Sequence, residues 1–114
     1  MKMTGAQTYS WIFYAVALAS QSEPVNCAGI ESVADGINHS VPTQKEMKAS
    51  LAWAVAQNLI QKEGKRYRLT EDGKKLLEGA STGTMMKTWK NLESKFGKRG
   101  AGDRAQLDPR TMST

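Results

Sequence analysis

The run from residue 43 to residue 79 constrains the fold most, because it joins a helix, a hairpin and a second helix without a break. Thr43 and Glu46 have the spacing of a capping box, in which each side chain bonds the other residue's backbone amide at a helix start. An apolar stripe at helical spacing follows, and it comprises Met47, Leu51, Ala54, Val55 and Leu59. The sequence therefore predicts a helix over about residues 43–60 with this stripe facing a core.

The two halves of this helix are expected to differ in exposure. A second apolar stripe lies nearly opposite the first in the later turns, and it comprises Ala49, Trp53, Ala56 and Ile60. The second half is therefore expected to be buried on two sides. Polar side chains gather in the first half, namely Gln44, Lys45, Lys48 and Ser50, and we expect these four to be exposed.

A short β-hairpin is predicted over about residues 61–68. Gly64 marks its turn, and Tyr67 and Leu69 alternate with arginines as in a strand that has one buried face. Thr70 follows directly and is a favourable first cap for the next helix. The run thus ends as it began, with a capped helix.

The segment before this run predicts two further helices. Residues 8–21 are apolar nearly all round, which predicts a helix buried on more than one side. The same segment resembles a secretory signal, but its positive region is one lysine, and its nine consecutive apolar residues are fewer than the roughly twenty that span a bilayer. Residues 28–38 have helical apolar spacing, and Val25 and Asn26 are predicted to form a very short strand before them.

Charge is spread unevenly along the chain. The 114 residues include 16 Lys or Arg and 11 Asp or Glu, which gives a net charge of +5. Most of the excess lies in residues 43–75, which hold eight basic and four acidic side chains, and in residues 85–99. These segments form either an ordinary solvated surface or one that attracts a polyanion.

The single cysteine and the single histidine exclude several kinds of site. Cys27 alone forms no intrachain disulfide and no thiolate metal cluster, which favours a reducing, cytoplasmic compartment. We expect Cys27 to be buried as a small apolar residue and His39 to bond locally in a turn. The sequence shows no nucleophile with a base, no phosphate-binding glycine motif and no carboxylate pair placed in a pocket. The chain is therefore predicted not to be an enzyme and to need no cofactor.

The C-terminal part predicts a docking helix and a tail. A flexible connection over residues 80–84 precedes an amphipathic helix that ends at residue 96 and is too short to be stable alone in water. It is expected to pack on the first helix of its own chain or of a second copy, giving a homodimer, with peripheral membrane contact as the alternative. The predicted dimerisation residues are Trp11, Tyr14, Met85, Trp89, Leu92 and Phe96. Residues 97–114 are predicted to be disordered.

The predicted order of elements is three helices, a two-stranded ribbon and a fourth helix. The residues that carry a family resemblance are Leu51, Leu59, Ile60, Gly64, Tyr67, Arg68, Leu69, Thr70 and Gly73. They resemble the end of the third helix, the wing and the step after it in the winged helix-turn-helix superfamily of small prokaryotic regulators. The resemblance covers about residues 8–80. It implies a mainly α fold with a small β-ribbon, a winged-helix domain over residues 1–79 and an extra C-terminal amphipathic helix.

The resemblance also implies a function, that of a transcriptional regulator that binds double-stranded DNA. In DNA-binding relatives the first half of the third helix enters the major groove, and the wing contacts flanking phosphate or the minor groove. The residues expected at DNA are Ser40, Thr43, Gln44, Lys45, Lys48, Lys62, Lys65 and Arg66. Glutamine can bond an adenine edge, and lysine can reach a guanine edge or a phosphate.

Two alternatives to this function stay open. The link over residues 38–42 is longer than the tight turn of many DNA-binding members, and the wing is short, so a winged helix that binds a protein partner also fits. A ligand-sensing regulator would need a cavity, which aromatic side chains could line unless they pack in the core. The aromatic residues concerned are Tyr9, Trp11, Phe13, Tyr14 and Trp89.

Overall fold

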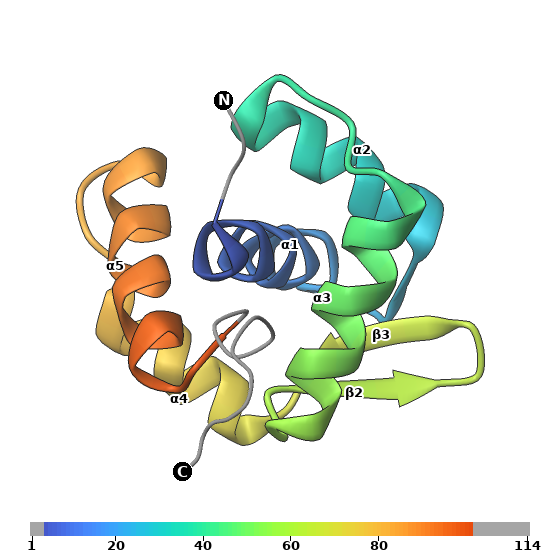
Figure 1. Ribbon diagram of the computed structural model, residues 1–114. Helices are drawn as coiled ribbons and strands as arrows, with labels where there is room; N and C mark the ends of the chain where they lie inside the picture. Colours follow the sequence, from blue (N-terminus) through green and yellow to red (C-terminus); the bar gives the residue numbers. More distant parts are fainter. Residues whose placement is uncertain (1–3, 102–114) are drawn as a thin grey trace, which may run out of the picture.

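The computed structural model describes residues 4–101, which form five helices and one three-stranded antiparallel sheet (Figure 1). In chain order the elements are α1 (Gly5–Ala19), β1 (Val25–Asn26), α2 (Cys27–Asn38), α3 (Gln44–Ala56), β2 (Ile60–Glu63), β3 (Arg66–Leu69), α4 (Glu71–Ala80) and α5 (Met85–Lys98). The prediction of a mainly helical fold with a small β-ribbon is confirmed. Within the described residues, every helix is too short or too polar to cross a membrane.

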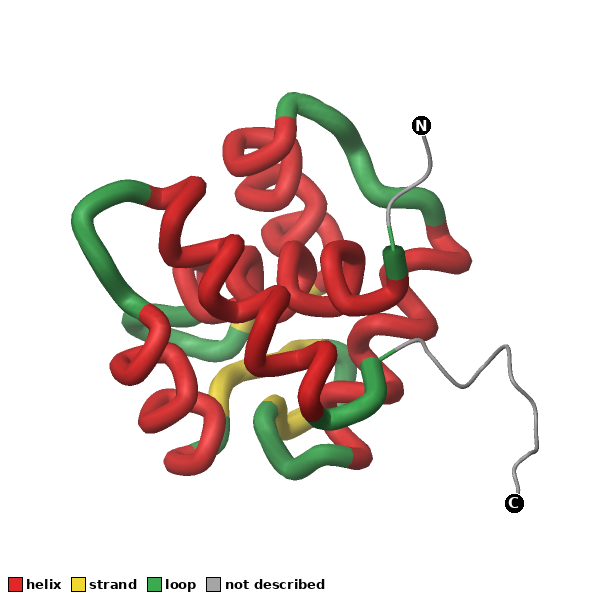
Figure 2. Tube along the Cα trace, turned by 60° about the vertical axis from the view of Figure 1, so that its left-hand side comes forward, coloured by secondary structure: helices red, strands yellow, loops and turns green. Residues whose placement is uncertain are grey.

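Helix α1 is the centre of the fold, and α2, α3 and α5 pack around it (Figures 1 and 2). Eight consecutive side chains of α1, residues 10–17, are buried. Because successive residues of a helix point in different directions, such a run can be buried only if neighbours surround the helix. The prediction that this segment is buried on more than one side is confirmed, although the helix begins at Gly5, three residues earlier than expected.

The sheet has the strand order β1-β3-β2, so the middle strand is the last of the three in the chain. Tyr67 of β3 lies opposite Val25 on one side and Lys62 on the other, while Ile60 pairs with Leu69. Alternation along the strands therefore places Ile60, Lys62, Tyr67 and Leu69 on the same face of the β2-β3 ribbon. Ile60 and Leu69 are buried in the core.

Helix α3 ends at Ala56, four residues earlier than predicted. Asn58 adopts a left-handed backbone with φ of 61°, and the Leu59 amide donates to the carbonyl of Ala54 at 2.9 Å. The Asn58 amide donates to the carbonyl of Val55 at 3.0 Å, which completes a Schellman motif. The apolar spacing predicted a longer helix, and Leu59 is buried as that spacing requires. The left-handed turn, and not a continued helix, places its side chain in the core.

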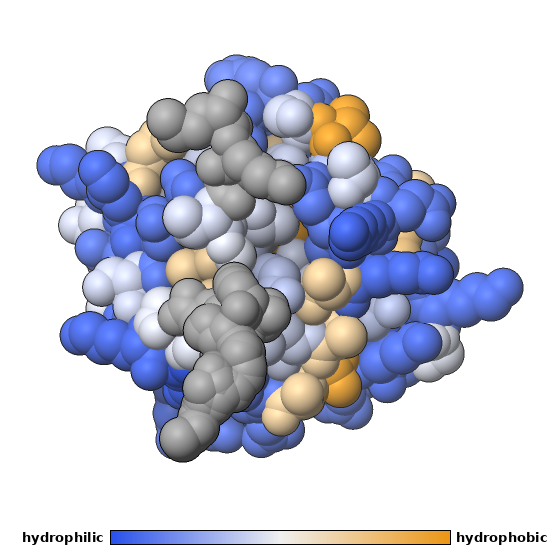
Figure 3. All heavy atoms as spheres, viewed as in Figure 1, coloured by the Kyte–Doolittle hydropathy of each residue, from blue (hydrophilic) through white to orange (hydrophobic). Residues whose placement is uncertain are grey.

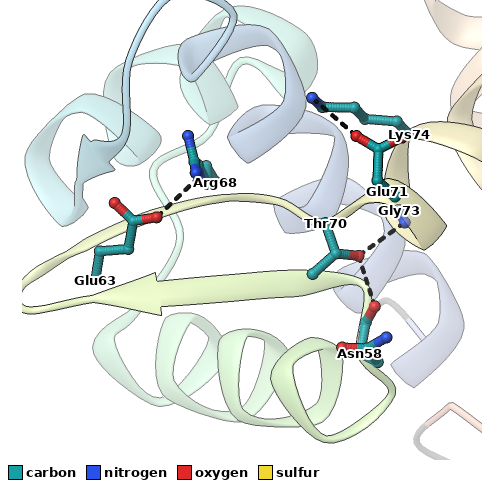
Figure 4. Close-up of polar contacts among 7 residues, drawn as sticks. All are labelled: Asn58, Glu63, Arg68, Thr70, Glu71, Gly73 and Lys74. Carbon is teal, nitrogen blue, oxygen red and sulfur yellow. Dashed lines mark hydrogen bonds and ion pairs between the residues drawn. The ribbon is translucent and has the colours of Figure 1, made fainter.

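The step from the ribbon into α4 is held by Thr70 (Figure 4). The Thr70 hydroxyl donates to the Asn58 carbonyl at 2.6 Å and accepts from the Gly73 amide at 3.0 Å, so it caps the helix as predicted. The Thr70 amide donates to the Leu59 carbonyl at 3.1 Å. A Cβ added at Gly73 would lie 2.1 Å from that carbonyl oxygen. Only glycine therefore allows α4 to approach the start of the ribbon this closely.

Helix α5 packs on α1 of its own chain. Five of the six residues predicted for dimerisation are buried inside this one subunit, namely Trp11, Tyr14, Trp89, Leu92 and Phe96. The assignment of these five to a dimer interface is therefore corrected, because a buried side chain offers no surface to a second copy. The sixth residue, Met85, is 44% exposed.

Aromatic packing joins α5 to the rest of the core. Ring centroids lie 6.3 Å apart for Trp11 and Trp89, 5.3 Å for Phe13 and Phe96, and 4.9 Å for Trp53 and Phe96. These separations are typical of packed aromatic pairs. Of the two roles left open for the aromatic residues, the structure favours core packing over the lining of a cavity.

The end of α5 extends beyond the predicted boundary. The helix continues to Lys98, two residues past the expected end, and Ala101 beyond it is buried. Residues 97–101 of the predicted tail are therefore part of the folded chain. The remainder of that prediction, residues 102–114, lies outside the described residues.

Candidate nucleic-acid interface

The start of α3 has the capping box that the sequence predicted. The Thr43 hydroxyl accepts from the Glu46 amide at 3.0 Å, and the Glu46 carboxylate accepts from the Thr43 amide at 2.9 Å. Gln44, Lys45 and Lys48 follow in the first two turns, and all three are exposed as expected. The capping box therefore fixes the helix start from which three of the predicted DNA contacts project.

Ser50 was predicted to be exposed, and this is wrong. Its side chain is 1% exposed, and its hydroxyl oxygen has no hydrogen-bond partner among the described residues. Ser50 lies three residues after Met47, so it shares the face that α3 turns to the core. Because serine is polar, the sequence pattern placed Ser50 among the exposed residues.

An open groove with a volume of about 680 Å³ lies between helix α3, the first turns of α2 and the ribbon. Its apolar lining comprises Met47, Leu51, Ala52, Val55, Ala56 and Tyr67. Its polar lining comprises Cys27, Glu31, Gln44, Lys48 and Lys62. The groove thus brings together three of the predicted DNA-binding residues, two from α3 and one from β2.

Strand alternation places Lys62 on the groove side of the ribbon, beside its cross-strand neighbour Tyr67. The Lys62 ammonium lies 6.0 Å from the centroid of the tyrosine ring, at the outer limit of a cation–π contact. Burial raises the pKa of the Tyr67 phenol above its ordinary value, and the nearby Cys27 raises it further. The phenol therefore stays neutral at physiological pH, and the charge at this wall of the groove is that of Lys62.

The other basic residues of the wing lie apart from the groove. Arg66 points to the opposite face of the ribbon, where its guanidinium donates to the Pro24 carbonyl at 3.2 Å. Arg68 lies on that face too and pairs with Glu63 at 2.8 Å (Figure 4). Lys65 is exposed in the turn. The structure therefore separates Arg66 from Lys62, although sequence reasoning grouped them at one wing tip.

The link between α2 and α3 holds two further residues singled out by the sequence. Ser40 is exposed in a bend. His39 ends α2 in a left-handed conformation with φ of 56°, and its amide donates to the Asp35 carbonyl at 2.6 Å. The prediction that His39 bonds locally in a turn is confirmed.

Cys27 is exposed, so the prediction that it is buried is wrong. It is the first residue of α2, and Asn26 before it caps the helix by accepting from the Gly29 amide at 2.9 Å. First-turn side chains of α2 lie beside the groove, which explains why a small apolar residue is left outside the core here. The asparagine cap is the sequence signal that would have placed the helix start at Cys27.

The rest of the surface near α3 is mixed. Figure 3 shows hydrophilic side chains projecting from the side where α3 and the ribbon lie in Figure 1, with smaller apolar patches between them.

Among the residues that the structure describes, no three or more His, Cys, Asp or Glu side chains are grouped so as to hold a metal ion. In comparisons with known proteins, no family model, curated protein or solved structure matches the chain.

Proposed function

We propose that the chain is a winged helix-turn-helix protein that binds double-stranded DNA through the start of α3 and the wing formed by β2 and β3. The order of elements supports this assignment, because three helices precede a ribbon whose inner strand pairs with a short strand before the second helix. The observation that carries the proposal is that Gln44, Lys48 and Lys62 come from two separate elements and line the same groove.

The start of α3 is suited to an anionic partner by its lysines, because two exposed ammonium groups, those of Lys45 and Lys48, lie within the first two turns. A B-form major groove is about 12 Å wide and admits one α-helix, so Gln44 can reach a base edge while Lys45 and Lys48 reach phosphates or guanine. A domain of this kind serves as a transcriptional regulator.

The salt dependence of duplex binding tests the proposal. Affinity is measured by fluorescence anisotropy with a labelled duplex over a series of salt concentrations. Each lysine that neutralises a phosphate contributes about 0.9 to the slope of log affinity against log salt, so Lys48→Ala and Lys62→Ala should each reduce the slope by about that amount. Lys87→Ala is the matched control, because it removes the same charge from α5, across α1 from the groove (Figure 1).

Two results would overturn this proposal. One is duplex binding that does not change with salt. The other is an equal effect of Lys87→Ala and Lys48→Ala, which would mean that the whole basic surface acts without a defined interface.

One observation favours a second candidate function, a winged helix that binds a protein partner. Val55 is 41% exposed on α3, and Ala52 and Ala56 beside it are exposed as well. An apolar strip of this kind on a helix is a common feature of protein interfaces. Absence of duplex binding at every salt concentration, with the chain folded, would favour this second function.

A further inference from the structure

We infer that the groove between α2, α3 and the ribbon binds a small molecule with an apolar body and one carboxylate. Its volume of about 680 Å³ lies within the range of roughly 300–1,000 Å³ typical of small-molecule pockets. Met47 and Leu51 form a buried part of its lining, and Val55 extends the apolar surface toward solvent. An apolar body placed there removes from water its own surface and the exposed apolar surface of Val55, Ala52 and Ala56, which is favourable.

The charged side chains of the lining decide which head group such a molecule carries. Lys48 stands on the α3 wall and Lys62 on the ribbon wall, while Glu31 on α2 contributes the one carboxylate. Two cations and one anion leave a net charge of +1, which complements a monoanion. The Gln44 amide adds a neutral hydrogen-bond donor beside Lys48. A carboxylate accepts from ammonium and amide donors of this kind, whereas a cation would face two ammonium groups.

Occupancy of the groove would also affect DNA, and this step rests on the proposed function. Gln44, Lys48 and Lys62 line the groove and belong to the proposed DNA interface. A carboxylate bound there cancels the net charge of +1 that the groove lining would offer to phosphate. The ligand and the duplex therefore compete, and the apolar carboxylate acts as an effector that releases DNA.

Cys27 provides a direct measure of occupancy, because it is the only cysteine of the chain and lines the groove. The rate of its alkylation by iodoacetamide, a neutral reagent, is measured without DNA at increasing decanoate below the micellar range. Decanol is the uncharged control with the same chain length. Decanoate is expected to slow alkylation to a plateau. Decanol is expected to protect only at concentrations about tenfold higher, because it loses two exposed ion pairs worth about fivefold each and is relieved of a repulsion from Glu31 worth about twofold to threefold.

Charge variants sharpen this test. Lys48→Gln and Lys62→Gln should each raise the decanoate concentration for half protection about fivefold. Glu31→Gln should lower the decanoate concentration for half protection by about twofold to threefold. A disturbed fold would not produce such a gain in affinity. Lys87→Gln on α5 is the matched control and should leave that concentration unchanged. Circular dichroism of each variant checks that the helices are retained.

Several outcomes would overturn the inference. Unchanged alkylation with decanoate would show that the groove does not take the ligand, and equal protection by decanol would show that no carboxylate is recognised. Protection that grows with protein concentration alone would mean that a second copy covers the groove. Because this assay contains no DNA, its failure is separate from a failure of duplex binding. If protection occurs and a duplex binds, decanoate should also weaken duplex binding in the wild type, and in Lys62→Gln it should do so only at about fivefold higher concentrations.

Discussion

Replacing Gly73 by alanine should destabilise the protein, although alanine is the better helix former. The added Cβ would lie 2.1 Å from the carbonyl oxygen of Leu59 and 3.1 Å from its carbon, both backbone atoms. Relief requires α4 to retreat by roughly 1 Å, which stretches the Thr70 bonds to Asn58 and Leu59 beyond hydrogen-bond range. Two lost bonds at about 1 kcal/mol each and overpacking of about 1–3 kcal/mol exceed the helix gain of about 1 kcal/mol.

The net loss should therefore be about 2–4 kcal/mol in the free energy of unfolding, measured by urea unfolding followed by circular dichroism. Gly79→Ala is the matched control in the same helix, because its Cβ would meet only the end of the Lys95 side chain at 3.6 Å. That variant should be as stable as the wild type or more stable by up to about 1 kcal/mol. A Gly73→Ala protein as stable as the wild type would refute the argument that close backbone approach requires glycine here.

Two further substitutions should stabilise the fold. Ser50→Ala removes a buried hydroxyl that has no partner in the described structure, and it should raise the free energy of unfolding by about 1 kcal/mol. A loss in urea unfolding would show that the hydroxyl is bonded. His39→Gly relieves the left-handed backbone at φ of 56° and should add up to about 1 kcal/mol, seen as a higher melting temperature. A lower melting temperature would mean that the imidazole makes a stabilising contact.

The parts of the fold that were predictable are those set by residues close together in the sequence. The reciprocal bonds of Thr43 and Glu46 span three residues, and Thr70 reaches Gly73 over the same spacing. Such bonds need no information about distant parts of the chain. The end of α3 was not predictable in this way, because the apolar period continues through Leu59 and only the left-handed turn at Asn58 breaks it.

The candidate interface was predictable only in part, for a related reason. Exposure of Gln44 and Lys48 follows from the polar first half of α3. The groove depends on how α2 and the ribbon approach α3, which is a tertiary arrangement without a local signal. For this reason the sequence predicted neither that Cys27 lines the groove nor that Arg66 lies apart from it. Strand register decides the second case, since Arg66 lies one residue away from Tyr67 and so faces the other way.

The acidic residues near α3 and the wing weaken the proposed interface less than their number suggests. Glu46 is engaged with the backbone amide of Thr43, where its charge also complements the positive helix end. Glu63 is paired with Arg68 on the face of the ribbon that turns away from the groove. The acid that does line the groove is Glu31, which shares this lining with Lys48 and Lys62. Removing its charge should therefore strengthen binding of both a carboxylate and a duplex, and the same substitution probes both proposals.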